Sequence, residues 1–271
     1  MKVSKSVCLV VLNNFKNDSR VLKEAITLKN SGYKVLVLAM FDEGQLKEEI
    51  VKEIQVQRLE LKSRSWSKMK FVQILKYFEF LARAYSVAKH YDIIHCNDLN
   101  ALPVGALCKI FKNKKVVYDA HEFEINHKPN ESKISIKINY VIEKTLIRHA
   151  DKVITVSDSI ANEYVKLYNI EKPRLVFNTP KYQEVDESNL FSRIFDLGSS
   201  QTIFLYQGNL SEGRGVELLV ETFQSLYLDI KNNKNYPVII FMGYGPLEGY
   251  VKDVSTKFSN IYFQPAVSPE N

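Results

Sequence analysis

The fold is decided by the stretch SVCLVVLNNFKNDSRVLKEAITLKN at residues 6–30. Residues 6–12 are almost all apolar, which is typical of a strand buried on both faces of a sheet. Residues 19–30 have the spacing of an amphipathic helix, and Asp18 or Ser19 is a suitable N-cap for it. The stretch therefore predicts a strand, a polar loop and a helix, in that order.

The same alternation continues along the chain. Further strands are expected at 34–40, 92–96, 116–119 and 152–156, and further helices at 101–111 and 135–149. Nearly all-apolar strands that alternate with helices indicate a parallel sheet with helices on both faces. We therefore predict an α/β protein whose first domain, residues 1–185, contains a complete doubly wound sheet.

A second set of strands is expected at 202–206, 238–242 and 261–263, with helices at 216–232 and 247–258. Residues 178–200 have the polar, Pro- and Gly-containing composition of a connection between domains. Three strands are fewer than the ~5 to 6 of a typical sheet, and they would leave an exposed edge. We therefore expect a partial second domain at 186–271 whose sheet needs further strands.

Composition narrows the class of protein. Apolar residues make up 45% and charged residues 25% of the 271 residues, as in ordinary folded proteins. The net charge of +6 suits an anionic ligand or membrane surface but is too small to indicate nucleic acid. Cys8, Cys96 and Cys108 show no CxxC spacing and are interpreted as buried thiols. The apolar run at 7–12 is too short to span a membrane, so a cytoplasmic location is expected.

Polar residues follow two of the expected strands in the first domain, at the strand ends where an open α/β sheet collects its ligands. Asn14, Asp18 and Arg20 follow the first strand, and they either bind an acceptor or a phosphate or simply form a capped loop. His121 and Glu122 follow the strand at 116–119. His121 is interpreted as a general base, a hydrogen-bond donor to phosphate, or a structural side chain.

A glycine-containing loop follows the first strand of the second domain and leads into the helix expected at 216. Its candidate ligand-binding residues are Gly208, Asn209, Arg214 and Gly215. Glycines let the backbone approach a phosphate, a helix N-terminus attracts anions, and an arginine donates to phosphate oxygens. The loop therefore predicts phosphate binding, with a glycine-rich turn and a solvated arginine as the alternative.

The loop after the next strand contains Gly243, Gly245 and Pro246, and Pro246 suits the first position of the helix that follows. As the neighbour of the first glycine loop, it would shape one side of a nucleotide pocket. The sequence has no Asp-x-Asp, GxxxxGK[ST] or HExxH motif. We therefore expect no metal site and no bound cofactor.

Residues 62–90 combine lysines and arginines with Trp66 and a long aromatic-rich helix. Basic residues beside exposed aromatic side chains dock on anionic lipid headgroups, which would place the protein at the inner face of the membrane. The alternative is a helix that packs its aromatic side chains on the sheet and leaves its lysines in solvent.

In their order along the chain, these features resemble the retaining glycosyltransferases of the GT-B fold, family four. The matching stretches are 17–25, 95–103, 119–122, 150–157, 208–215 and 243–246. The resemblance implies an N-terminal Rossmann-like domain that holds an acceptor and a partial C-terminal Rossmann-like domain that holds a UDP- or GDP-linked sugar. It also implies metal-independent transfer with retention to a glycan or lipid-linked acceptor, in polysaccharide or glycoconjugate biosynthesis.

The resemblance implies roles for individual residues as well. Arg214 matches a basic residue on the donor diphosphate, and His121 matches a histidine near the reacting sugar. Asn209 stands where many members carry a second arginine. The family pattern continues past 267–270 with a helix that carries two glutamates. The alternatives are a non-catalytic remnant that binds acceptor, membrane or a second polypeptide completing the C-terminal domain, and a nucleotide-sugar epimerase.

Overall fold

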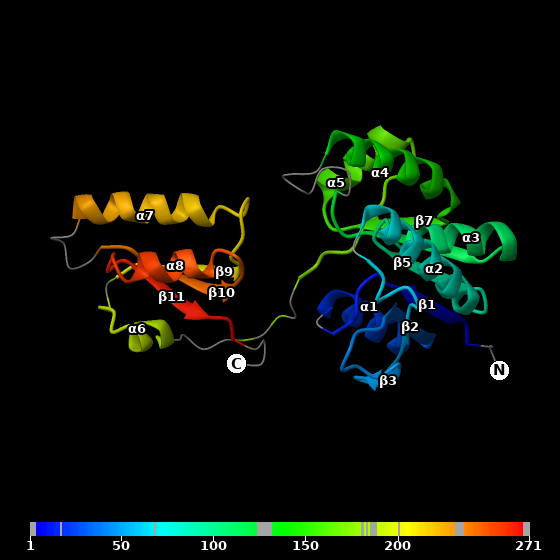
Figure 1. The fold of residues 1–271 in the computed structure, drawn as a ribbon, viewed down its shortest axis with the longest axis horizontal. Helices are drawn as coiled ribbons and strands as arrows, with labels where there is room; N and C mark the ends of the chain where they lie inside the picture. Colours follow the sequence, from blue (N-terminus) through cyan, green and yellow to red (C-terminus); the bar gives the residue numbers. More distant parts are fainter. Residues whose placement is uncertain are drawn as a thin grey trace. The chain divides into compact units, whose positions relative to one another are not determined.

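The computed structural model describes residues 4–16, 18–67, 69–123, 132–179, 182, 184, 189–199, 201–230 and 236–267. The chain divides into two compact units, Met1–Pro180 and Lys181–Asn271, each a sheet with helices packed on it (Figure 1). The division lies a few residues before 185, the boundary expected from the sequence. Each unit is described separately below.

Unit 1 is built on an eight-stranded sheet in the order β3-β4-β2-β1-β5-β6-β7-β8. Its strands β1 to β8 span Ser6–Val10, Lys34–Met40, Glu48–Val51, Ile54–Leu59, Ile93–Asn97, Lys115–Ala120, Lys152–Thr155 and Arg174–Leu175. Its helices α1 to α5 span Ser19–Asn30, Lys70–Ala88, Leu102–Lys112, Lys133–Leu146 and Asp158–Tyr168, and a 3-10 turn covers Ile147–His149. The expected α/β alternation is confirmed.

One strand pair departs from the expected parallel sheet. β3 pairs antiparallel with β4, and neither strand was expected from the sequence. Their turn is formed by Lys52 and Glu53, which both adopt positive φ angles of 45° and 66° without the glycine or asparagine that usually marks such a hairpin. β3, a half-exposed and charged strand at the edge of the sheet, also lacks the apolar run that reveals a buried strand.

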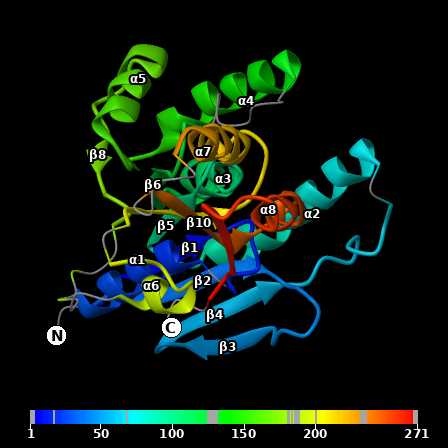
Figure 2. The same ribbon diagram turned by 90° about the vertical axis from the view of Figure 1, so that its left-hand side faces the viewer.

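The helices of unit 1 cover the two faces of the sheet unequally. Helices α2 to α5 share one core cluster with the sheet, whereas the opposite cluster contains buried residues of α1 only. Helices in parallel crossover connections run opposite to their strands, so α2 and α4 begin at the edge where β4 and β6 end. Figure 2 shows the first turns of α2 and α4 extending toward the same side of unit 1. None of the helices in the described ranges is long and apolar enough to cross a bilayer.

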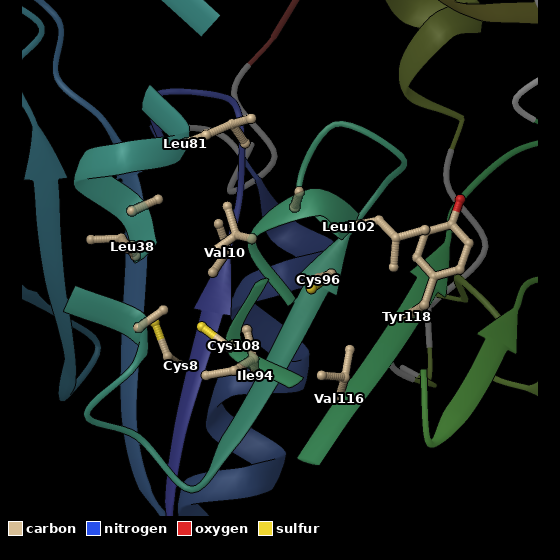
Figure 3. Packing of buried hydrophobic residues seen from close by; sticks show 14 of the residues in the cluster. Cys8, Val10, Leu38, Leu81, Ile94, Cys96, Leu102, Cys108, Val116 and Tyr118 are labelled. Carbon is tan, nitrogen blue, oxygen red and sulfur yellow. The ribbon is translucent and has the colours of Figure 1, made fainter. Parts of the chain in front are cut away.

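The larger core cluster contains the three cysteines. Cys8, Cys96 and Cys108 are free thiols that are 0% exposed, and Figure 3 shows them among Val10 and Ile94. The interpretation of these residues as buried thiols is confirmed. Cys96 also fits closely against α3, because a Cβ on Gly105 would lie 2.4 Å from its Sγ atom.

A buried carboxylate links α4 and α5 to the sheet. Glu143 is 0% exposed and accepts hydrogen bonds from the hydroxyl groups of Tyr118 at 2.6 Å, Tyr164 at 2.5 Å and Tyr168 at 2.6 Å. No cation takes part in these bonds, so phenol donors replace the water that the carboxylate loses. Glu143 thereby holds two helices and β6 in one arrangement.

Unit 2 is a three-stranded parallel sheet in the order β11-β10-β9. Its strands β9, β10 and β11 span Ile203–Asn209, Val238–Tyr244 and Ile261–Pro265, and its helices α6, α7 and α8 span Leu190–Ile194, Val216–Ile230 and Glu248–Ser255. The short helix α6 lies within the stretch expected to be a connection, and Phe195 just after it packs against Tyr262 of β11. Leu247 is the N-cap of α8, and Pro246 comes just before it, outside the helix. The prediction that Pro246 occupies the first helical position is therefore wrong.

Candidate active site

The candidate site residues of unit 1 lie around one pocket of about 490 Å³ at the carboxyl edge of the sheet. It is lined by Asn13, Asn14, Lys16, Asp18, Ser19, Arg20, His121, Glu122 and Asn178. All five candidates from the first domain, Asn14, Asp18, Arg20, His121 and Glu122, are among these residues. The pocket therefore joins the loop after β1 to the loop after β6.

Asp18 and Asn14 shape the rim of this pocket. Asp18 is the N-cap of α1, because its carboxylate accepts from the backbone N–H of Val21 at 3.1 Å, and it also accepts from the Asn13 amide. The Asn14 side chain donates to Asp42, and the backbone carbonyl oxygen of Asn14 accepts from the Arg58 guanidinium at 2.9 Å. The contacts of these two residues hold the loop in place, while Glu122 lies exposed at the rim.

His121 is held between two carboxylates. Its Nε2 atom lies 3.1 Å from Asp119 and its Nδ1 atom 3.3 Å from Asp98. Burial lowers the pKa of His121, but the hydrogen bond to Asp119 and the charges of Asp119 and Asp98 outweigh burial and raise it. A protonated imidazole donates from both nitrogens, so the two carboxylates stabilise the charged form of His121. A charged imidazole has no free nitrogen to act as a general base.

Asp98 reaches His121 from an unusual backbone conformation. Its φ angle is 65°, in the left-handed region, and its backbone N–H donates to the carbonyl oxygen of Asp119 at 2.9 Å. Aspartate tolerates this region better than most residues do. The turn after β5 thus directs a carboxylate toward the residue that follows β6.

Arg20 supplies a second positive charge beneath His121. Its guanidinium donates to the fully buried Asp119 at 2.6 Å and to Glu24, one helical turn further along α1, at 3.2 Å. Burial opposes ionisation of Asp119, but the hydrogen bond from His121 and the neighbouring imidazole of His95 hold the pKa of Asp119 well below its usual range. Asp119 therefore carries a negative charge at neutral pH.

The pKa of Glu24 is raised, whereas that of Asp119 is lowered. Burial and the negative charge of Asp119 raise the pKa of Glu24 to about 7. Its Oε2 atom lies 3.6 Å from His95 Nε2, and neither atom has a hydrogen-bond partner among the described residues. Glu24 is thus a carboxyl group that exchanges its proton near neutral pH, directly behind Arg20 and Asp119.

Three carboxylate and imidazole groups here are close enough to share a cation. One ligand atom from each of Glu24, Asp119 and His121 lies within 4.8 Å of the others. However, the Arg20 guanidinium already contacts both carboxylates. Arg20 thus already supplies a positive charge to the two carboxylates of this cluster.

Glu24, His95, Asp98 and Asp119 were not among the site residues expected from the sequence. Asp98 and Asp119 stand at the ends of strands β5 and β6, the same type of position that identified His121. Glu24 follows Arg20 by one helical turn, a spacing that brings side chains together. His95 alternates with Cys96 along β5 and faces α1 while Cys96 faces α3, as expected for opposite faces of a strand.

A second hollow of about 410 Å³ lies beside α2, at the end of strand β2. It is lined by Leu12, Met40, Phe41, Leu61, Arg64, Gln73, Lys76, Tyr77 and Phe80. Arg64 pairs with Asp42, but the Lys76 ammonium donates only to the carbonyl oxygens of Arg64 and Trp66. The hollow therefore combines an apolar lining with a cation that no carboxylate of the described residues offsets.

In unit 2 the two glycine loops lie next to each other. Gly208 and Gly243 are paired in adjacent strands, and a Cβ on Gly243 would lie 1.9 Å from the carbonyl oxygen of Gly208. Leu210 N–H donates to the carbonyl oxygen of Tyr244, and Leu247 N–H donates to that of Leu210. The adjacency expected from the sequence is confirmed, and the two loops are fixed to one another.

The remaining loop residues differ in how closely they are held. A Cβ on Gly245 would lie 2.4 Å from the carbonyl oxygen of Leu210 and 2.5 Å from the side chain of Asn209. Gly215 has a φ angle of 77° and precedes α7, which begins at Val216. Arg214 is exposed and forms no ion pair among the described residues. The loop therefore offers a cation beside the start of a 15-residue helix.

Unit 1 and unit 2 thus have the architecture of GT-B glycosyltransferases, with parallel sheets whose strand ends carry the polar loops. Sucrose-phosphate synthase from Thermosynechococcus elongatus superimposes with a TM-score of 0.73 over 97% of this chain and 71% of its own, at 15% identity. Anabaena HepE, solved in complex with UDP-glucose, superimposes with a TM-score of 0.63 over 97% of this chain and 69% of its own, at 14% identity. At these identities the likeness concerns the fold.

The family follows from the sequence itself. Residues 19–178 match Glycosyltransferase Family 4, and the chain belongs to that family. An uncharacterized glycosyltransferase of Methanocaldococcus jannaschii is 26% identical over 172 residues, which are 60% of this chain and 43% of that protein. The chain thus spans less than half the length of that relative. The stretch 19–178 that matches the family contains Arg20, Glu24, Asp119 and His121.

Proposed function

We propose that this chain provides the acceptor-side domain and part of the donor domain of a glycosyltransferase. It transfers a sugar from a UDP- or GDP-linked donor to a glycan or lipid-linked acceptor, in polysaccharide or glycoconjugate biosynthesis on the cytoplasmic side of the membrane. The observation that carries the proposal is His121, which is held between Asp98 and Asp119 on the wall of the 490 Å³ pocket.

The donor is assigned to the glycine loops of unit 2. The proposed contacts are Gly208, Asn209, Arg214, Gly215, Gly243 and Gly245. The backbone at these glycines lacks side chains that would block a diphosphate, and Arg214 and the N-terminus of α7 attract it. Anabaena HepE, which shares the fold, was solved with UDP and with UDP-glucose, and this supports a nucleotide sugar as the ligand.

The charge on the leaving nucleoside diphosphate grows as the glycosidic bond breaks. In this proposal Arg214, backbone N–H groups and the dipole of α7 stabilise that charge, so transfer needs no metal ion. The imidazolium of His121 contributes a positive group near the reacting sugar and a donor for its hydroxyl groups. The acceptor hydroxyl attacks from the face that the diphosphate leaves, and the anomeric configuration is retained.

A lipid-linked acceptor is supported by the 410 Å³ hollow beside α2. Its apolar lining suits a hydrocarbon segment, and Lys76 suits an acidic linker group, because its charge is not offset by a carboxylate of the described residues. The hollow and the His121 pocket both lie at the carboxyl edge of the unit 1 sheet. An acceptor bound by its lipid end would therefore present its sugar end toward the same edge as His121.

Nucleotide binding tests the proposal directly. UDP or GDP is expected to raise the melting temperature by mass action, by an amount that grows with nucleotide concentration. Arg214→Ala should remove most of this shift, and Arg193→Ala, an exposed arginine in α6, should leave it unchanged. Equal shifts in all three proteins would reject the assignment of Arg214. Hydrolysis of a panel of nucleotide sugars then identifies the base and the sugar.

The second candidate is a chain that binds its ligands only together with a second polypeptide, and the exposed edge strand β9 supports this candidate. Phe204 and Leu205 of β9 are 51% and 45% exposed, and no described strand pairs with the outer side of β9. A strand supplied by a second polypeptide would cover these side chains. In that case the chain alone should bind no nucleotide, and binding should appear only when the partner is added.

A further inference from the structure

Helix α2 has two apolar faces, and only one of them packs on the sheet. Phe80, Leu81, Ala84 and Ala88 are buried in the core of unit 1. Phe71, Ile74, Leu75 and Phe78 follow one another at helical spacing and are exposed, with Phe71 at 68% and Phe78 at 61%. The aromatic helix thus packs on the sheet through its second half, and its first half presents a separate apolar stripe.

Helix α4 repeats this arrangement. Ile134, Ile138, Val141 and Ile142 form an exposed stripe, and Ile134 is 72% exposed. Like α2, α4 begins at the carboxyl edge of the sheet, and the first turns of both helices extend toward the same side of unit 1 (Figure 2). We call the exposed stripes of α2 and α4, together with Trp66 and Met69, the α2–α4 surface.

Positive charges predominate around the α2–α4 surface, and the one acidic residue of α2, Glu79, is paired with Arg83. The sequence from Leu61 to Phe78 contains lysines and an arginine but no aspartate or glutamate. In α4 the exposed Lys133 and Lys137 form no ion pair among the described residues, and the only acidic residue of α4 is Glu143, which is buried. Exposed apolar side chains bordered by unpaired cations match an anionic lipid surface, with hydrocarbon beneath its headgroups.

We propose that the α2–α4 surface docks unit 1 on a bilayer that contains anionic lipid. The apolar stripes insert among the headgroups, and Lys62, Lys133 and Lys137 contact phosphates. Docking in this way places the hollow beside α2 next to the bilayer. This inference does not depend on nucleotide binding, so lipid binding and nucleotide binding can fail separately.

The test uses the full chain and vesicles of phosphatidylcholine with or without phosphatidylglycerol. Trp66, the single tryptophan, lies within the surface, so its emission should shift to shorter wavelength when the protein binds. Binding is expected to need phosphatidylglycerol and to weaken as salt is raised, because salt screens exposed charges. Replacing both Lys133 and Lys137 by Gln should weaken binding by about fivefold for each cation removed.

The apolar part is tested by Phe71→Ser combined with Phe78→Ser. Both side chains are exposed, so the variant should fold normally by far-UV circular dichroism and lose at least about tenfold in vesicle affinity. The matched control is Phe111→Ser. It removes a 66% exposed phenylalanine at the end of α3, near the amino-terminal ends of the parallel strands, and this variant should bind vesicles like the parent.

Three results would overturn the inference. The first is no binding to either vesicle composition, and the second is equal binding to both compositions. The third is a dimer in sedimentation that the Phe71 and Phe78 variant dissociates, without any vesicle binding. That result would assign the α2–α4 surface to a second copy of the chain.

Discussion

The Nη2 atom of Arg20 lies 2.6 Å from Oδ1 of Asp119, a residue 99 positions further along the chain. Asp119 is fully buried at the end of β6, and Arg20 is nearly buried in the first turn of α1. This ion pair joins α1 to β6, the two elements next to the loops that line the candidate pocket. The loop geometry therefore depends on a contact between distant parts of the sequence.

Removing Arg20 should destabilise unit 1. Arg20→Met leaves the Asp119 carboxylate buried without its guanidinium, and the expected loss is about 3 to 5 kcal/mol in the free energy of unfolding. Urea titration of the full chain measures this loss. Lys29→Met breaks the exposed pair with Glu53 and should cost at most about 1 kcal/mol. Equal losses for the two variants would show that burial of the Arg20 pair is energetically unimportant.

Glu24 should make stability decrease as pH rises from about 4.5 to 7. In this range the folded protein keeps the Glu24 proton, because the pKa of Glu24 is about 7, whereas the unfolded chain releases it near 4.5. Unfolding then releases a proton, so the contribution of Glu24 is full below pH 4.5 and is lost as pH passes 7. For this mostly buried side chain the loss amounts to up to about 3 kcal/mol.

The comparison with Glu24→Gln isolates this effect. The variant should show a flatter profile of unfolding free energy between pH 5 and 7, measured by urea titration at each pH. His121, whose pKa is raised, adds a loss of stability at pH values above its ordinary 6.5 in both proteins. A profile for Glu24→Gln as steep as that of the parent would assign the pH dependence to other groups.

The tyrosines around Glu143 should each contribute to stability. Tyr164→Phe removes a hydroxyl that donates to a fully buried carboxylate, and the expected cost is about 1.5 to 3 kcal/mol. Tyr140→Phe is the control, because among the described residues the Tyr140 hydroxyl accepts only from the exposed Lys144, and its loss should be close to neutral. Thermal unfolding of both variants, followed by circular dichroism, gives the comparison.

Gly243→Ala should disrupt unit 2. The new methyl group would lie 1.9 Å from the Gly208 carbonyl oxygen in the neighbouring strand, and overpacking of this kind costs about 1 to 3 kcal/mol. Amide hydrogen exchange in β9 and β10 should become faster. Gly249→Ala in α8 meets no atom within 4 Å and should instead stabilise unit 2 by about 0.5 to 1 kcal/mol. Unchanged exchange in the Gly243 variant would mean that the strands move apart without cost.

Much of the fold was predictable because each central strand carries its own apolar signal. The helix cap at Asp18, the parallel strands and the neighbouring glycine loops follow from local patterns of this kind. The β3–β4 hairpin was not predictable, since β3 is half-exposed and the turn uses Lys52 and Glu53. A strand or turn can be predicted from the sequence only when its residues form a pattern, such as an apolar run or a glycine turn, that distinguishes it from the neighbouring sequence.

The site was predictable only in part, for a related reason. His121 was identified from its position just after a strand, and Arg20 from its position at the start of the helix that follows the first strand and its loop. Glu24 and His95 lie within regular elements, so no local pattern distinguishes them from other helix and strand residues. Their involvement depends on the distance between α1 and β5, which tertiary packing sets.

The three buried cysteines make opening of unit 1 measurable by thiol alkylation. All of them lie in unit 1, and burial raises the pKa of the Cys108 thiol to about 11, which keeps the reactive thiolate scarce. An alkylating reagent can modify these thiols only when the surrounding helices separate from the sheet. The rate of alkylation therefore measures how often unit 1 opens. Unit 2 has no cysteine and does not contribute to this rate.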